Sequence, residues 1–280
     1  MDHPRLHHRG LAVVSACTLC GSAARTKLAD YTAPPAGETD FGIPGYRRAL
    51  WRCDGCGHIV NEHGFDLATT LYQGAYAEAT YGDKMRATFA KIMGLPPERS
   101  DNRRRVARVE RFAAEHGLTG ERTLLDVGSG LGVFPAAMRE AGWTATALDP
   151  DARACAMVEE LAGVATLCGD FMTLTPPGRY DLVTFNKVLE HVQPMAAMLA
   201  RARDYLSPRG AVYVELPDGE AAALDTPDRE EFFVEHYCAF SMASLALLIR
   251  QAGFRALSVE RVREPSGKYT LRAFMDVWPG

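Results

Sequence analysis

The alternation of hydrophobic and polar positions divides the chain into two unequal parts. From about residue 120 onward, short apolar runs of buried-strand type alternate with segments that have helical periodicity. The expected strands are TLLDV, TATAL, VATLC, YDLVTF and AVYVEL, with helices at about 131–141, 151–162 and 194–206. Strands that alternate with helices predict a Rossmann-like α/β fold with a doubly wound, mostly parallel sheet.

The last part of the chain has a different pattern. A helix is expected over MASLALLIRQAGF, followed by strands near 255–263 and 269–277 that EPSGK joins. Two strands separated by so short a turn pair antiparallel. The pattern therefore predicts a C-terminal antiparallel hairpin, within a domain that we place at 120–280.

A helical connector or lid is expected over residues 63–119. Ser100 or Asp101 would cap the helix SDNRRRVARVERFAAEHGL, and Gly117 would end it. The arginines from 103 to 111 are expected to form a solvated face, with a phosphate-binding patch as the alternative. Three tyrosines of the connector are expected to pack or to close over a cofactor: Tyr72, Tyr76 and Tyr81.

Two Cys-x-x-Cys pairs mark a small module at about 13–62, after a flexible tail over 1–12. The turn-rich stretch between the pairs has too few apolar residues to build its own core. A glycine follows each pair, which lets the backbone fold so that its amides face the sulfurs. The pattern predicts a closed structural zinc site of zinc-ribbon type, with iron as the minor alternative. Its ligands would be Cys17, Cys20, Cys53 and Cys56.

Composition restricts the class of protein. With 47% apolar and 24% charged residues the chain has the composition of an ordinary globular protein. Its net charge of -4 differs from the strongly positive charge typical of proteins that bind a nucleic-acid backbone. Four of the seven cysteines lie in metal-type pairs, which favours a reducing, cytoplasmic location. No stretch approaches the ~20 apolar residues of a membrane-spanning helix, so no membrane partner is expected.

The segment LLDVGSGLGVF carries the central motif. A buried strand ends at Val127, a turn rich in glycine follows, and a helix opens at once. Acidic residues stand at the ends of three successive expected strands: Asp126, Asp149 and Asp170. Because ligands of doubly wound sheets bind at the carboxyl ends of the strands, these acids and the glycine turn indicate one ligand site.

These motifs carry a resemblance. DVGSGLG, ALDPD, CGDF, YDLVTFNKVLEHV and LSPRGAVYVELPD resemble the successive motifs of class I S-adenosylmethionine-dependent methyltransferases. The resemblance implies that Asp126 and the glycines cradle the methionine part, that Asp149 holds the ribose, and that the adenine lies at 170–171. The full set of implied cofactor residues is Asp126, Gly128, Ser129, Gly130, Gly132, Asp149, Pro150, Asp170, Phe171 and Asn186.

The N-terminal part carries a narrower resemblance. Cysteine pairs ending in CDGCGHIV, followed by LYQGAYAEATY and a methyltransferase domain, are similar to a bacterial group that includes deoxysugar C-methyltransferases. Those enzymes carry an additional C-terminal domain, whereas this chain stops after the hairpin, so their substrate does not carry over. Ribosomal RNA guanine methyltransferases also have an N-terminal metal site, but their fourth ligand is usually histidine.

A methyltransferase orients its acceptor and, where needed, removes a proton from it. His236 is the first candidate for the base and His191 the second, with Glu190 beside it, and a structural histidine is the alternative reading of each. The expected acceptor is a small molecule, such as a sugar, nucleotide sugar or hydroxylated biosynthetic intermediate, methylated at carbon or oxygen. The alternatives are an RNA methyltransferase that docks through the zinc module and a non-catalytic cofactor-binding protein.

Overall fold

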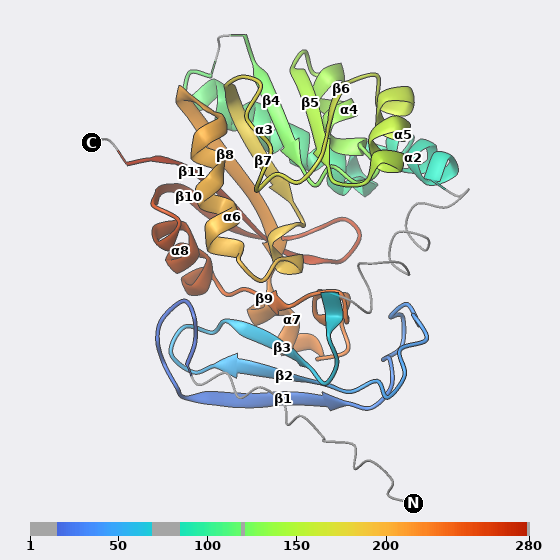
Figure 1. Cartoon of the computed structure of the whole chain (residues 1–280), viewed down its shortest axis with the longest axis vertical. Helices are drawn as coiled ribbons and strands as arrows, with labels where there is room; N and C mark the ends of the chain where they lie inside the picture. Colours follow the sequence, from blue (N-terminus) through green and yellow to red (C-terminus); the bar gives the residue numbers. More distant parts are fainter. Residues whose placement is uncertain (1–15, 69–84, 119–120, 279–280) are drawn as a thin grey trace, which may run out of the picture.

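The computed structural model describes residues 16–68, 85–118 and 121–278, which form two sheets (Figure 1). The larger sheet has seven strands in the order β10-β11-β8-β7-β4-β5-β6. Its parallel strands are β4 (Thr123–Val127), β5 (Thr144–Asp149), β6 (Ala165–Cys168), β7 (Tyr180–Asn186) and β8 (Leu206–Pro217). The C-terminal hairpin is β10 (Phe254–Arg263) and β11 (Tyr269–Val277), and β11 pairs antiparallel with both β8 and β10. The predicted fold class is confirmed.

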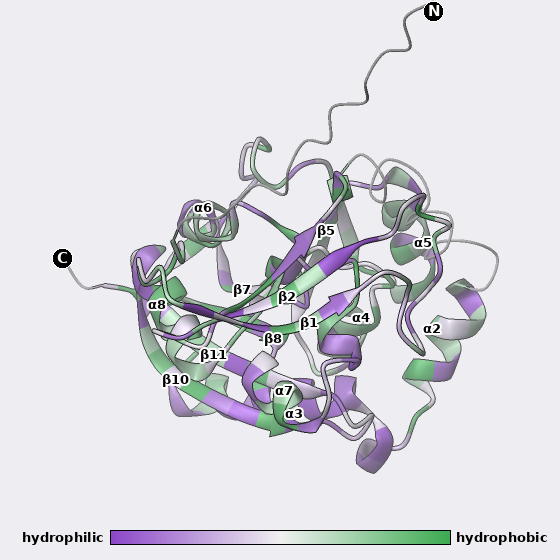
Figure 2. Cartoon of the chain, turned by 90° about the horizontal axis from the view of Figure 1, so that it is seen from below, coloured by the Kyte–Doolittle hydropathy of each residue, from purple (hydrophilic) through white to green (hydrophobic). Residues whose placement is uncertain are grey.

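Helices cover both faces of this sheet and enclose two apolar cores. One face packs against α6 (Met195–Arg201) and α8 (Met242–Gln251). The other packs against α3 (Asp101–Glu115), α4 (Val133–Glu140) and α5 (Ala152–Ala162), with α2 (Met85–Met93) beside α4. Figure 2 shows hydrophobic and hydrophilic residues alternating along α2, as its place at the edge of this layer requires. The shorter elements are η2 (Pro97–Arg99), η3 (Leu189–His191), η4 (Ala202–Tyr205), η5 (Glu230–Phe232) and α7 (Gly219–Asp225).

The α3 helix begins and ends where its sequence indicates. Ser100 caps it by accepting a hydrogen bond from the amide of Arg103 at 3.2 Å, and Gly117 follows it with φ +68°. The expectation for its arginines is wrong at two positions. Arg105 pairs with the buried Glu215 at 2.5 Å, and the buried Arg108 pairs with Glu260 at 2.5 Å. These two guanidinium groups are therefore neither a solvated face nor a phosphate-binding patch.

The N-terminal module contains regular strands that the turn-rich sequence did not indicate. They are β1 (Arg25–Tyr31), β2 (Arg48–Cys53) and β3 (Ile59–His63), all antiparallel. The fourth strand of this sheet is β9 (Cys238–Ala239), which comes from the C-terminal half of the chain and pairs with β3. The core under the sheet is likewise shared, because Leu50 and Ile59 lie in one cluster with Phe232 and Val234. A segment with too few apolar residues can fold here because part of the core under its sheet comes from the C-terminal half of the chain.

The module lies at the carboxyl ends of β7 and β8 (Figure 1). Asp218, which directly follows β8, bridges to Phe240 just after β9, and in the view from below β1 and β2 cross in front of the large sheet (Figure 2). The boundaries 13–62, 63–119 and 120–280 remain predictions. The predicted tail over 1–12 and the three connector tyrosines, Tyr72, Tyr76 and Tyr81, lie outside the described residues. Within the described ranges no helix combines the length and the apolar character needed to cross a membrane.

Candidate active site and four-cysteine site

The glycine turn between β4 and α4 has a backbone that side chains would disturb. Gly128, Gly130 and Gly132 have φ of +68°, +51° and +70°. A Cβ on Gly128 would lie 2.8 Å from a methyl carbon of Val188, and one on Gly132 would lie 2.8 Å from both methyl carbons of Val158. Because the neighbouring chain fills this space, the turn needs glycine in order to bring its backbone to the edge of the sheet.

Asp126 is anchored inside the protein beside this turn. Its Oδ1 accepts hydrogen bonds from Thr184 Oγ1 at 2.6 Å and Asn186 Nδ2 at 2.7 Å. Burial raises the pKa of Asp126 to about 6, and these two hydrogen bonds act in the opposite direction. Two buried oxygens near it, Asn186 Oδ1 and Ser129 Oγ, have no hydrogen-bond partner among the residues that the structure describes. Buried polar atoms without partners are costly, so these oxygens indicate a polar ligand.

Asp149 ends β5 with its carboxylate held by two amides. Gly130 donates to Oδ2 at 3.1 Å and Asp151 donates to Oδ1 at 3.0 Å, while burial raises the pKa of Asp149. A carboxylate oxygen has two acceptor positions, so each of these oxygens can accept one more hydrogen bond. Pro150 follows on the exposed side of the same turn. This arrangement fits a ligand that carries two neighbouring hydroxyl groups.

Asp170 and Phe171, the two residues expected near the adenine, follow β6. Asp170 accepts a hydrogen bond from the amide of Met172 at 2.9 Å. The ring of Phe171 is 2% exposed and stacks on Tyr205, with ring centroids 4.8 Å apart. Phe171 therefore belongs to the core, and contact of this pair of residues with an adenine stays a prediction.

Glu190, His191 and His236 come together at the end of β7. One potential ligand atom from each lies within 4.8 Å of the others, a spacing that a divalent cation could bridge. The Nδ1 atoms of His191 and His236 lie 3.0 Å from the backbone oxygens of Glu235 and Glu231. A carbonyl oxygen only accepts, so each Nδ1 carries the proton and each Nε2 is the basic nitrogen. Burial lowers the pKa of both rings, that of His191 to about 4, and both are therefore neutral at pH 7.

Glu190 is the most unusual group of the site. Its side chain is fully buried, and neither carboxylate oxygen has a hydrogen-bond partner in the described part of the chain. Burial raises its pKa to about 7, against the positive charge of Lys187. That lysine is partly buried, donates to Thr270 Oγ1 at 3.0 Å, and has a backbone φ of +61°, which is strained for a residue other than glycine. The positive charge of Lys187 disfavours a metal cation at this place. The two carboxylate oxygens of Glu190 instead favour a ligand that donates hydrogen bonds to them.

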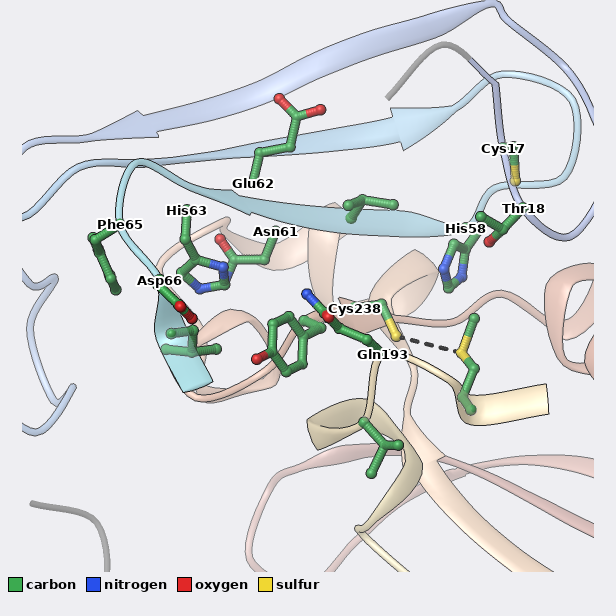
Figure 3. A pocket seen from close by; sticks show the side chains of 15 residues that line it. Cys17, Thr18, His58, Asn61, Glu62, His63, Phe65, Asp66, Gln193 and Cys238 are labelled. Carbon is green, nitrogen blue, oxygen red and sulfur yellow. Dashed lines mark hydrogen bonds between the residues drawn. The ribbon is translucent and has the colours of Figure 1, made fainter. Parts of the chain in front are cut away.

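Two cavities lie along the segment that carries His236. The smaller, of about 150 Å³, is lined by both carboxylate and lysine side chains, namely Lys187, Glu190, Glu230, Glu231, Glu235, Lys268 and their neighbours, His236 among them. The larger, of about 400 Å³, is lined by the next two residues, Tyr237 and Cys238, together with β3 and the loop after His191. Figure 3 shows Asn61 and His63 on one side of β3 and Glu62 on the other.

Sequence reasoning identified the two histidines, Glu190 and Asn186 but missed other residues of this site. Lys187 and Glu235 line the same cavity as His236, and Asn61 contacts its segment from the module. Lys187 carried a usable signal, because it directly follows a buried strand and the predicted Asn186. Asn61 carried none, since its role depends on contacts with residues more than 170 positions away.

The four cysteines of the module converge. Cys17 Sγ lies 3.7 Å from Cys56 Sγ, Cys20 Sγ lies 3.5 Å from Cys53 Sγ, and all four sulfurs lie within 4.8 Å of one another. Sulfurs bound at about 2.3 Å to one tetrahedral ion are about 3.8 Å apart, so the spacing fits a zinc ion. Burial raises the pKa of Cys53, and hydrogen bonds led by the amide of Cys56 lower it to about 7.

The two turns that carry these cysteines have the same backbone. The amides of Gly21 and Gly57 donate to the carbonyls of Cys17 and Cys53, each at 2.8 Å, and the two glycines have φ of +76° and +73°. The second turn is attached to the large domain, because Ser241 at the start of α8 donates to the carbonyl oxygen of Cys56 at 2.5 Å. The cysteine site and the large domain therefore share a contact.

Comparison with known proteins connects the fold to a family. The model of a family described as "Methyltransferase domain" matches residues 98–259. Among curated relatives, ubiquinone biosynthesis O-methyltransferase of Pseudomonas paraeruginosa is 33% identical over 105 residues, covering 35% of this chain and 45% of the relative. Cypemycin N-terminal methyltransferase of a Streptomyces species is 29% identical over 178 residues, covering 58% and 68%. C-methyltransferase NovU of Streptomyces niveus is 29% identical over 149 residues, covering 51% and 35%. The matches therefore span less than half the length of the first and the third.

Solved structures with this fold have low sequence identity to the chain. Magnesium protoporphyrin IX methyltransferase from Synechocystis PCC 6803, with bound SAH, has a TM-score of 0.55 at 13% identity and covers 71% of this chain and 97% of its own. Burkholderia thailandensis 1,6-didemethyltoxoflavin-N1-methyltransferase has a TM-score of 0.51 at 21% identity and covers 81% and 94%. That structure holds 1,6-didemethyltoxoflavin and S-adenosylhomocysteine. At these identities the likeness is one of fold.

Proposed function

Because this chain belongs to the methyltransferase domain family, whose model matches more than half of it, we propose that it methylates a small-molecule acceptor with S-adenosylmethionine. The relatives named above act on different acceptors, so their names support the class of reaction and not the substrate. The observation that carries the proposal is the cluster that follows β7, where His236, His191 and the buried Glu190 come together, four to five residues of chain after the anchored Asn186 in the case of Glu190 and His191.

The protein's own residues fit the methyl donor. Asp149 would accept the two ribose hydroxyls, while Asn186 Oδ1 and Ser129 Oγ would supply partners for the polar methionine end at the glycine turn. When bound, S-adenosylmethionine supplies a methyl group that its sulfonium already activates. The remaining work of the protein is to orient the acceptor and to receive its proton.

We assign the proton acceptor to Nε2 of His236, with His191 beside it. The acceptor's proton moves to this nitrogen while the acceptor atom gains the methyl group, and Glu190 orients the acceptor by accepting a hydrogen bond from it. Both rings are neutral at pH 7, so neither ring already holds the proton that it would have to accept. A hydroxyl or an acidic carbon of a sugar suits this arrangement.

The charges near the site favour one type of acceptor. None of the described residues that line the larger cavity is a lysine or arginine. In the smaller one, Lys187 bonds to Thr270 and Lys268 pairs with Glu230 at 3.1 Å. A diphosphate would find few cationic partners here, so we favour a sugar or hydroxylated biosynthetic intermediate over a nucleotide sugar.

The same charges disfavour RNA as the acceptor. Arg105 and Arg108, from the most basic run of the chain, are used in internal ion pairs, and the net charge is -4. Binding of structured RNA that weakens steeply with salt would restore the RNA alternative.

We assign the four cysteines to one structural zinc ion, and reduced thiolates of this kind suit a cytoplasmic location.

Calorimetric titration tests the donor first. Zinc-replete protein should bind S-adenosylmethionine and S-adenosylhomocysteine, and Asp149→Ala should lose that binding. Labelled methyl transfer to pools of sugars and hydroxylated metabolites would then identify the acceptor, with His236→Gln as the inactive comparison. Absence of donor binding by folded protein would overturn the proposal, and tight binding without transfer to any pool would favour a non-catalytic binding protein.

A further inference from the structure

The N-terminal module holds the segment 232–237, which carries His236, by its backbone. Asn61 on β3 is 4% exposed, and its Nδ2 lies 3.0 Å from the carbonyl oxygen of His236, 3.3 Å from that of Phe233 and 3.4 Å from that of Phe232. The amide of Asn61 donates to the carbonyl oxygen of Tyr237 at 2.9 Å. Asn61 therefore contacts the backbone of His236 itself and of residues on both sides of it in the sequence.

A buried ion pair of the module extends this contact. Arg48 and Glu38 pair at 2.8 Å with both side chains fully buried. Arg48 also donates to the carbonyl oxygen of Phe232 at 2.8 Å, and Glu38 accepts from the amide of Val234 at 2.7 Å. Burying two charges is expensive unless each is well hydrogen-bonded, and here the additional bonds go to the segment. His63 adds a further contact of 2.8 Å to the carbonyl oxygen of Val234.

The other side of the segment faces the candidate active site. His236 is fixed by its Nδ1 contact with Glu231, and its ring lies 4.8 Å from that of His191 in a near-perpendicular arrangement. The amide of Tyr237 donates to the carbonyl oxygen of Glu190 at 2.8 Å. The segment is thus held between the module on one side and Glu190 and His191 on the other.

We propose that Asn61, supported by the Arg48–Glu38 pair, is a positioning residue that sets the orientation of His236 relative to Glu190. The N-terminal module is then part of the catalytic apparatus, and its task is to define the acceptor site and not to dock a nucleic acid. This inference rests on the proposed role of His236. It requires no contact between Asn61 and the acceptor.

An isosteric substitution tests the inference. Asn61→Asp exchanges a donor for an oxygen that faces three carbonyl oxygens, and Asn61→Ala removes the donor without adding repulsion. Tyr31→Phe is the matched control. It deletes another hydrogen bond between module and large domain, from Tyr31 to the carbonyl of Pro227 at 2.6 Å, and keeps the ring that lies 4.0 Å from Arg48. Zinc content and melting temperature verify that each full-length variant is folded.

The first readout is the NMR signal of His236 in protein labelled at histidine Cε1, assigned with His236→Gln. In the native protein and in Tyr31→Phe this signal should stay that of a neutral ring between pH 5.5 and 8. In the Asn61 variants it should shift at pH 7.5 and titrate closer to the ordinary histidine pKa of about 6.5. If Asn61→Asp does not fold, Asn61→Ala decides by the same criterion. Signals that coincide with those of the native protein across this range would overturn the inference.

The second readout separates this inference from the proposed function. Calorimetric affinity for S-adenosylmethionine should be the same in the native protein and both Asn61 variants, because Asn61 lies outside the glycine turn. With an identified acceptor, kcat should fall about ten- to hundredfold in the Asn61 variants at unchanged KM for the donor. Failure of the native protein to bind the donor would refute the methyltransferase proposal, while the NMR comparison would still decide whether Asn61 orients His236.

Discussion

Replacing Glu190 by glutamine should stabilise the protein at pH 8 and have little effect on stability at pH 5. The carboxyl is fully buried, neither of its oxygens has a hydrogen-bond partner within residues 16–68, 85–118 and 121–278, and burial raises its pKa from 4.5 to about 7. An acid whose pKa is raised on folding opposes folding once the unfolded chain ionises it. The penalty is absent below about pH 4.5, grows up to about pH 7, and is constant above that.

The size of the effect follows from the two pKa values. They differ by about 2.5, and a difference of one corresponds to about 1.36 kcal/mol, so the penalty at pH 8 is about 3 kcal/mol. At pH 5 it is below about 1 kcal/mol by the same relation. The favourable interaction of the carboxylate with Lys187 is already contained in this pKa and is not subtracted again.

Glu215 provides the matched control, since it is also a fully buried glutamate but its pKa is lowered and not raised. Burial acts to raise its pKa, but the charges of Arg105 and Arg272 lower it to about 2. A lowered pKa stabilises the fold above about pH 4.5 and this contribution is lost as pH falls toward 2. Glu215→Gln should therefore destabilise the protein at pH 8, by about 3–5 kcal/mol, because Arg105 loses its carboxylate partner and Arg272 loses one of its two.

Urea unfolding at pH 5 and pH 8 measures both variants against the native protein. The difference for Glu190→Gln should appear at pH 8 and nearly disappear at pH 5. An equal difference at the two pH values would assign it to packing, and destabilisation of Glu190→Gln at pH 8 would show that the ionised carboxylate is favourable in the fold. Either result would refute the reasoning.

Three further predictions concern other parts of the structure. Gly132→Ala should destabilise the protein by about 1–3 kcal/mol in thermal unfolding, because the new Cβ would lie 2.8 Å from Val158, and adding Val158→Ala should recover part of the loss. Cys53→Ser should release the metal and lower the melting temperature, and unchanged zinc content by atomic absorption would remove the structural-zinc assignment. Ser241→Ala should cost about 1–2 kcal/mol, because it removes the cap of α8 and the bond to the carbonyl of Cys56, and a melting curve identical to that of the native protein would contradict this.

The large sheet was predictable because its signals are local. TLLDV and YDLVTF are short apolar runs, and these two strands lie within one residue of their expected positions, whereas β8 begins five residues before AVYVEL. The glycine turn and the acid that ends β5 follow from the same short segments. Helix α3 was equally clear, since Ser100 and Gly117 mark its two ends.

The N-terminal sheet and the positioning residues were not predictable in this way. RALWRC is a short run beside a turn-rich stretch that has too few apolar residues for a core of its own, and its core partners Phe232 and Val234 are about 180 residues away. The ion pair of Arg105 could not be recognised, because its partner Glu215 stands on a different element. The N-terminal strands and the partner of Arg105 depend on contacts between distant segments, and such contacts leave no periodic pattern in the sequence.

The pairing of β3 with β9 has a consequence for synthesis of the protein. Residues 59–60 form their partner contacts with residues 238–239, so the module leaves the ribosome long before its sheet can be completed. During that interval one edge of β3 exposes backbone groups that can pair with another nascent chain. Early loading of metal at the four cysteines would hold the two turns together during this interval, and growth under zinc limitation should therefore lower the soluble yield more than it lowers the stability of protein that has already folded.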